Sequence, residues 1–157
     1  MSILGAVTAD DQKSGKGAAL PAGTYRATIE SAQVEQKENG STLAVVFGNI
    51  RTKDGATEFA HNGGTYRIGN RKVFARHWVD HNNPQAAEIG QKMIKKLLIS
   101  TGILENKIGA SDNYSGYDEL AQDIAGKDAL LVTKIRTRTD ASGENVQEAD
   151  VATYLAP

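Results

Sequence analysis

Aromatic rings and cations are interleaved within one stretch of the chain, residues 66–78. Single-stranded nucleic acids are bound by flat rings on which bases stack and by cations that follow the phosphates. In an extended chain Phe74, Arg76 and Trp78 point to the same side, because side chains alternate along a strand. The alternative is that Phe74 and Trp78 are core residues flanked by solvated cations. The first interpretation predicts a surface for single-stranded DNA made by Tyr66, Arg67, Arg71, Lys72, Phe74, Arg76 and Trp78.

A second group of cations, Lys134, Arg136 and Arg138, is spaced at every other residue. In a strand all three lie on one face, while Thr133 and Ile135 face the other way. Like charges this close repel each other, and a bound polyanion would relieve the repulsion. An ordinary solvated face explains the pattern equally well. We therefore include the three residues as candidates for contact with DNA.

Residue types that would support catalysis are scarce in this sequence. There is no cysteine, and neither of the glycine-rich phosphate-binding motifs, G-x-x-x-x-G-K-[ST] and G-x-G-x-x-G, is present. His77 and His81 would form a metal-binding pair only in a helix, and the Asn82-Asn83-Pro84 sequence that follows argues against one. Nothing converges on the three neighbouring carboxylates Asp118, Glu119 and Asp123. We expect a protein that is not an enzyme and that needs no metal and no cofactor.

Charge is unevenly distributed along the chain, although the net charge is only −1. Residues 51–107 contain ten basic and five acidic residues, whereas residues 108–157 contain four basic and nine acidic ones. If the two segments form separate surfaces, the protein is polarised and can steer a polyanion to one side. Simple solvation of both segments is the alternative.

Strand signals fill the first half of the chain. Alternation of apolar and polar residues starts at Thr24, and Asn39-Gly40 suits a tight hairpin turn before the apolar run 43–47. Strand-like residues 57–60 and 65–68 are interrupted by Asn62-Gly63-Gly64, and residues 71–79 are expected to be extended.

A helix is predicted next, because the apolar spacing changes to that of a helix. Asn83 can cap the N-terminus, Pro84 suits the first helical position and Gly102 ends the helix. Gly90 lowers helix stability by up to ~1 kcal/mol relative to alanine, which predicts close packing there. The stripe expected to face the core comprises Ala86, Ile89, Met93, Ile94, Leu97 and Leu98.

The chain closes with a short helix at residues 117–124 and two strands, 127–138 and 145–155, joined by a turn at 140–143. The resulting order, three strands, one main helix and two strands, is that of the OB fold, a five-stranded, partly open barrel that binds oligonucleotides. We expect a mainly β protein with a five-stranded OB-like barrel (β-β-β-α-β-β) as one nucleic-acid-binding domain, residues 21–157. Residues 1–20, which are small, polar and glycine-rich, are expected to form a flexible arm.

Short motifs at the element boundaries suggest a relationship. They are Pro21-Ala22-Gly23-Thr24-Tyr25, Gly40-Ser41-Thr42-Leu43, Trp78, Asn83-Pro84-Gln85-Ala86, Thr101-Gly102 and residues 120–127. Through them, residues 20–155 resemble a bacteriophage family long known as a domain of unknown function and related to phage single-stranded-DNA-binding proteins of OB fold. The resemblance implies a protein that coats and protects exposed strands in phage DNA replication or recombination, independently of sequence.

The expected partner is single-stranded DNA, with replication or recombination proteins and self-association as open alternatives. A protein-interaction or assembly module on the same barrel, without nucleic-acid binding, is the main alternative function. No apolar run approaches the roughly 20 residues needed to span a bilayer, and the N-terminus lacks the pattern of a signal peptide. We therefore expect no membrane partner and a location in the cytoplasm, that of the host cell if the protein is phage-encoded.

Overall fold

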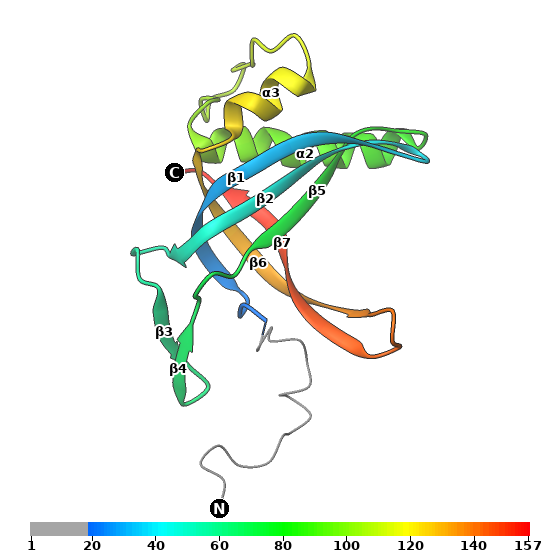
Figure 1. The fold of residues 1–157 in the computed structure, drawn as a ribbon. Helices are drawn as coiled ribbons and strands as arrows, with labels where there is room; N and C mark the ends of the chain where they lie inside the picture. The colour runs from blue at the N-terminus through cyan, green and yellow to red at the C-terminus, as the bar shows by residue number, and fades with distance from the viewer. Residues whose placement is uncertain (1–18) are drawn as a thin grey trace, which may run out of the picture.

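The computed structural model describes residues 19–157, which form a mainly β fold with two helices (Figure 1). Five antiparallel strands form one sheet in the order β5-β2-β1-β6-β7, and β3 and β4 form a separate two-stranded sheet. The elements are β1 (Gly23–Lys37), β2 (Gly40–Thr52), β3 (Glu58–His61), β4 (Gly64–Arg67), β5 (Val73–His81), α2 (Pro84–Thr101), α3 (Tyr117–Ile124), β6 (Asp128–Thr139) and β7 (Asn145–Leu155).

The first described residues already belong to the core. Most of the arm expected at residues 1–20 lies outside the described residues, but Leu20 is buried with the core side chains. The carbonyl oxygen of Pro21 accepts a hydrogen bond from the buried Tyr25 hydroxyl at 2.7 Å. The packed domain therefore begins slightly before residue 21.

β1 is the central strand of the sheet and is longer than the alternation at its start indicates. It pairs with β6 over residues 23–28 and with β2 over almost its whole length. The register with β2 shifts between Arg26 and Thr28 and again between Ile29 and Ser31. Such irregularities bend a strand and increase its twist, and Figure 1 shows the sheet strongly curved around its buried side.

The segments 57–60 and 65–68, expected as one interrupted strand, form a hairpin instead. β3 and β4 pair only with each other, because the chain reverses direction at Asn62 and Gly63. Both residues have positive φ, 48° and 78°, as a tight hairpin turn with an Asn-Gly sequence requires.

α2 follows the predicted boundaries and covers the outer edge of β5. The Asn83 side chain accepts a hydrogen bond from the Gln85 backbone N–H at 3.0 Å, and Gly102 ends the helix at φ 83°. The close approach predicted at Gly90 is confirmed, because a Cβ there would lie 2.1 Å from the Trp78 carbonyl oxygen. The Gln91 amide also donates to the Val79 carbonyl oxygen at 2.9 Å, which satisfies a backbone group at the edge of the sheet.

One member of the predicted apolar stripe is exposed, and two others, Ala86 and Met93, are only half-buried. Ile89 is 60% exposed, whereas Gly90, Ile94, Leu97 and Leu98 are buried. The helix is rotated so that glycine approaches the strand, and this turns the preceding isoleucine towards solvent.

The two outermost strands of the sheet meet through their buried side chains. His77 of β5 and Tyr154 of β7 are both buried, and the His77 Nε2 atom lies 2.6 Å from the Tyr154 hydroxyl oxygen. Burial lowers the pKa of His77 to about 4 and raises that of Tyr154. The sheet therefore curls far enough to bring its first and last strands into contact.

Candidate nucleic-acid interface

β5 separates its residues into a buried and an outward row, as the alternation predicted. Val73, Ala75, His77 and Val79 are buried, while Phe74, Arg76 and Trp78 point outward. Phe74 is 58% exposed and Trp78 is half-buried. The prediction that these three share one face is confirmed, and the alternative that Phe74 is a core residue is wrong.

Strand register places short side chains beside this row. Thr42, Ala44 and Val46 of β2 lie opposite Trp78, Arg76 and Phe74 respectively. The next strand, β1, places Glu35, Gln33 and Ser31 opposite the same three β2 residues. We call this surface, the outward side of Glu30–Lys37, Gly40–Gly48 and Lys72–Trp78, the β1–β2–β5 face.

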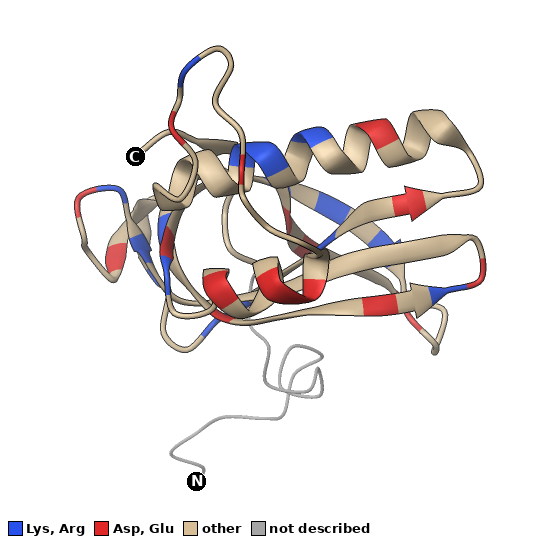
Figure 2. Ribbon diagram, turned by 90° about the horizontal axis from the view of Figure 1, so that it is seen from above, with Lys and Arg blue, Asp and Glu red and all other residues tan. Residues whose placement is uncertain are grey.

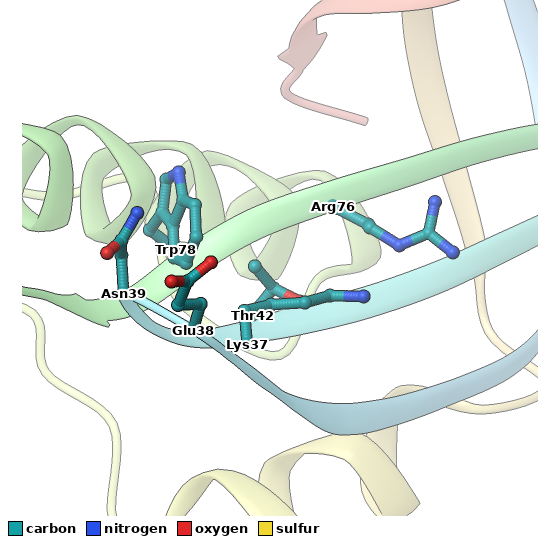
Figure 3. A pocket seen from close by; sticks show the side chains of 6 residues that line it. All are labelled: Lys37, Glu38, Asn39, Thr42, Arg76 and Trp78. Carbon is teal, nitrogen blue, oxygen red and sulfur yellow. The ribbon is translucent and has the colours of Figure 1, made fainter.

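A shallow hollow lies at the end of this face near the β1–β2 turn. It is open to solvent, has a volume of about 280 Å³ and is lined by Lys37, Glu38, Asn39, Thr42, Arg76 and Trp78. Figure 3 shows the Trp78 ring beside the turn residues, with Arg76 farther along β5. An open hollow of this kind suits part of an extended ligand better than a small molecule that must be enclosed.

The Trp78 ring is held from one side by a histidine. The His81 ring packs against it at 78° with 4.3 Å between the ring centroids. The His81 Nδ1 atom in turn accepts a hydrogen bond from the Asn83 backbone N–H at 2.8 Å. The start of α2 therefore helps to orient the tryptophan side chain.

The cations of the face already have acidic partners on β1. Arg76 Nε lies 3.3 Å from Glu35 Oε1, and Lys37 Nζ lies 3.5 Å from the other oxygen of that carboxylate. Lys72 Nζ lies 2.8 Å from Glu30 Oε2. A phosphate that binds Lys72 or Arg76 would therefore compete with a carboxylate.

Three of the predicted residues belong to, or lie beside, the separate β3–β4 hairpin. Tyr66 packs against Phe59 with 5.4 Å between ring centroids, and the Arg71 guanidinium lies 5.1 Å from the centre of the Tyr66 ring. Arg67 forms an ion pair with Glu58 at 3.3 Å. In Figure 1 this hairpin lies beyond the end of β2, away from the β1–β2 turn. The stretch 66–78 thus contributes to two surfaces rather than one.

The second predicted group of cations lies along β6. Lys134, Arg136 and Arg138 are exposed, and β7 places Asp150 opposite Lys134 and Glu148 opposite Arg136. Glu148 accepts from Arg136 at 3.2 Å and from Arg138 at 2.9 Å, and Asp150 lies 3.9 Å from Arg136. These ion pairs offset the repulsion that suggested a bound polyanion.

Charge does not separate into the two surfaces that the sequence segments suggested. Figure 2 shows acidic positions on α3 and mostly basic ones on α2. On the sheet, however, cations and acids from distant segments pair with each other, as in the 2.8 Å contact between Arg51 and Asp128. The contrast in charge therefore persists at the helices but not across the β1–β2–β5 face.

Two of the three neighbouring carboxylates noted in the sequence, Glu119 and Asp123, accept hydrogen bonds from nearby residues. Glu119 accepts hydrogen bonds from the Ser115 backbone N–H and hydroxyl, which lower its pKa, and Asp123 accepts from the Tyr114 hydroxyl. His77 is buried while His81 lies at the surface end of β5, so the two do not form a pair. Within residues 19–157, no group of three or more His, Asp or Glu side chains could hold a metal ion, and no helix is long and apolar enough to cross a membrane.

Sequence reasoning did not include the β1 and β2 residues of the face. A tight turn sets the register of the two strands that it joins, but the turn lies at Glu38 and Asn39, because Lys37 pairs with Gly40, and not at the predicted Asn39-Gly40. Counting back from Asn39-Gly40 pairs Glu35 with Ala44, whereas its partner in the structure is Thr42.

The sequence matches no protein-family model, and it has no match among the curated proteins with which it was compared. The function must therefore be argued from the geometry of the surfaces described above.

Proposed function

We propose that the protein binds single-stranded DNA, independently of sequence and without catalysis, on the β1–β2–β5 face. The observation that carries the proposal is the outward row of Phe74, Arg76 and Trp78 on β5. An exposed phenylalanine, a cation and an indole beside short β2 side chains provide stacking surfaces with a charge between them. Stacking on such rings accepts any base, because every base has a flat face.

We further propose that the curved sheet is a barrel of the OB type. The order β5-β2-β1-β6-β7 and the position of α2 between β5 and β6 in the chain support this topology. The contact between His77 and Tyr154 supports closure between β5 and β7. OB folds bind oligonucleotides on their second and third strands and on the loops after the first and fourth strands. Here these correspond to β2, β5 and the turns at 38–39 and 140–144.

The resemblance of the boundary motifs to those of the phage family suggests a biological role for this binding. We propose that the protein coats and protects exposed strands in phage DNA replication or recombination, in the cytoplasm of the host. Replication or recombination proteins would then meet it on the DNA.

One observation favours a second candidate, a protein-interaction module. The cations of the face are paired with Glu30 and Glu35, which leaves a surface of exposed rings and mixed charges. Protein interfaces are enriched in aromatic residues and arginine and have a polar rim. A protein partner would therefore bury the same Phe74 ring without the need to displace either carboxylate.

The single tryptophan of the chain allows a direct test. Titration with unlabelled oligothymidine should quench Trp78 fluorescence, and a duplex of equal length should bind more weakly because its bases are not free to stack. Anisotropy of a labelled oligonucleotide provides an independent affinity. Equal affinity for single strand and duplex would remove the stacking argument, and absence of binding to both would favour the protein-interaction module.

A further inference from the structure

Two ion pairs cross the middle strand of the β1–β2–β5 face. Glu30 of β1 reaches Lys72, just before β5, with 2.8 Å between carboxylate oxygen and ammonium nitrogen. Glu35 of β1 reaches Arg76 of β5 at 3.3 Å. β1 and β5 are both neighbours of β2 and are not paired with each other. Each ion pair therefore passes over the β2 backbone.

The sequence of β2 provides room for both crossings. At Gly48, a Cβ would lie 1.8 Å from Glu30 Oε1 and 2.3 Å from its Cδ, so the carboxylate rests directly on the β2 backbone. Ala44, which is opposite Arg76, has only a methyl group. Larger residues at these positions would separate the acids of β1 from the cations of β5.

The acids lie deeper in the surface than the cations that they hold. The side chains of Glu30 and Glu35 are 38% and 26% exposed, whereas those of Lys72 and Arg76 are 49% and 57% exposed. A polyanion that approaches from solvent therefore meets the cations first and the carboxylates behind them.

We propose that, in the unbound protein, Glu30 and Glu35 bind the same cations that DNA phosphates bind in the complex. They hold Lys72 and Arg76 across β2 until the phosphates of a single strand take over these cations. The inference rests on the proposed function and adds two residues that set its affinity. After the exchange each carboxylate remains close to a phosphate, and repulsion between the two charges weakens binding.

The position of Phe74 supports this arrangement. It lies two residues from Lys72 and two from Arg76, and an extended chain advances about 3.3 Å per residue. The two exchange positions are thus about 13 Å apart along the strand, with the exposed ring between them. When a base stacks on Phe74, the DNA backbone on its two sides would contact Lys72 and Arg76.

Neutralising each acid without changing its shape tests the inference. Glu30→Gln and Glu35→Gln should each tighten binding of oligothymidine by about fivefold at low salt. This factor corresponds to about 1 kcal/mol, the repulsion of two unit charges 4 Å apart in water. The gain should shrink as salt increases, because added ions screen exposed charges.

Glu88→Gln is the matched control. It removes the same charge and also breaks an ion pair, that of Glu88 with Lys92 at 3.3 Å on α2, outside the residues that define the face. Thermal unfolding of each variant checks that the fold is intact. If the wild-type protein binds oligothymidine but Glu30→Gln and Glu35→Gln equal the Glu88→Gln variant or bind more weakly, the inference is wrong and the proposed function stands. If the wild-type protein and all the variants fail to bind single strands, the proposed function itself is wrong.

Discussion

The sheet presents cations on two outward surfaces, and these differ in what lies beside the charge. On β5, Arg76 lies between Phe74 and Trp78, and its acidic partner comes from β1, across an intervening strand. On β6, Arg136 and Arg138 share Glu148, which belongs to the directly adjacent strand β7. No aromatic residue occurs between residues 134 and 150. The same alternation of cations therefore occurs in two different surroundings. Of the two strands, only β5 combines the charge with aromatic rings on which a base can stack.

The largest effect that we expect concerns the buried contact between His77 of β5 and Tyr154 of β7, the strand that pairs with β6. Burial lowers the pKa of His77 to about 4, so the unfolded chain takes up a proton near pH 6.5 that the folded protein does not accept until about pH 4. The contribution of the neutral, buried His77 to the free energy of unfolding is therefore fully present above pH 6.5. The free energy of unfolding should fall by about 3 kcal/mol as the pH decreases to 4. Urea unfolding between pH 4 and 7 measures this decrease.

Two variants identify the group responsible. His77→Gln should remove most of the pH dependence in this range. Tyr154→Phe should keep it, because burial rather than the hydroxyl is the main cause of the lowered pKa. If His77→Gln shows the same pH dependence as the wild-type protein, another group is responsible.

The next effect compares exposed apolar side chains on the two strands, with Ile135 on the opposite face of β6 from Arg136. Phe74→Ala should weaken binding of single-stranded DNA by about 1–3 kcal/mol, the contribution of stacking by one base. Ile135→Ala, a truncation of an exposed apolar residue on β6, should leave the affinity unchanged. Both variants should unfold like the wild-type protein. Equal decreases in affinity would mean that β6 also contacts the ligand and would end the distinction between the two surfaces.

The smallest effect concerns the salt dependence of binding. For single strands, the slope of log affinity against log salt should flatten by about 0.7 when one cation that binds a phosphate is removed. We expect this change in Arg76→Ala and little change in Arg136→Ala, whose carboxylate partners lie on the adjacent strand. Titrations at four or five salt concentrations measure both slopes. A flatter slope in the Arg136→Ala variant alone would place the phosphates on the β6–β7 hairpin instead.

The sequence predicted features that depend on neighbouring residues along the chain. Alternation identified the outward row of β5, and the cap at Asn83 and the stop at Gly102 bounded α2 correctly. Gly90 indicated that α2 approaches a neighbouring element closely, because glycine lowers the stability of a helix and tight packing must offset that loss.

Features that depend on register between strands were missed. Glu30 and Glu35 become partners of Lys72 and Arg76 only through two successive strand pairings, and the shifts in the β1–β2 register cannot be read from either strand alone. Likewise, the acids Glu148 and Asp150 neutralise β6 only after the β6–β7 pairing is known. The candidate rings were thus predictable, whereas the charges that control access to them were not.

The close contact between Gly90 and the backbone of Trp78 has a thermodynamic consequence. Binding of a flexible ligand is weakened by every protein group that must become ordered in the complex. Here α2 rests on the Trp78 backbone, and β2 pairs with the same residue on its other side. Only the indole torsions are left to be restricted when a ligand binds. The main chain of this residue is already ordered in the folded protein, so binding a ligand costs no further main-chain entropy there. Stacking on Trp78 therefore contributes more to the affinity than stacking on a residue whose main chain must first become ordered.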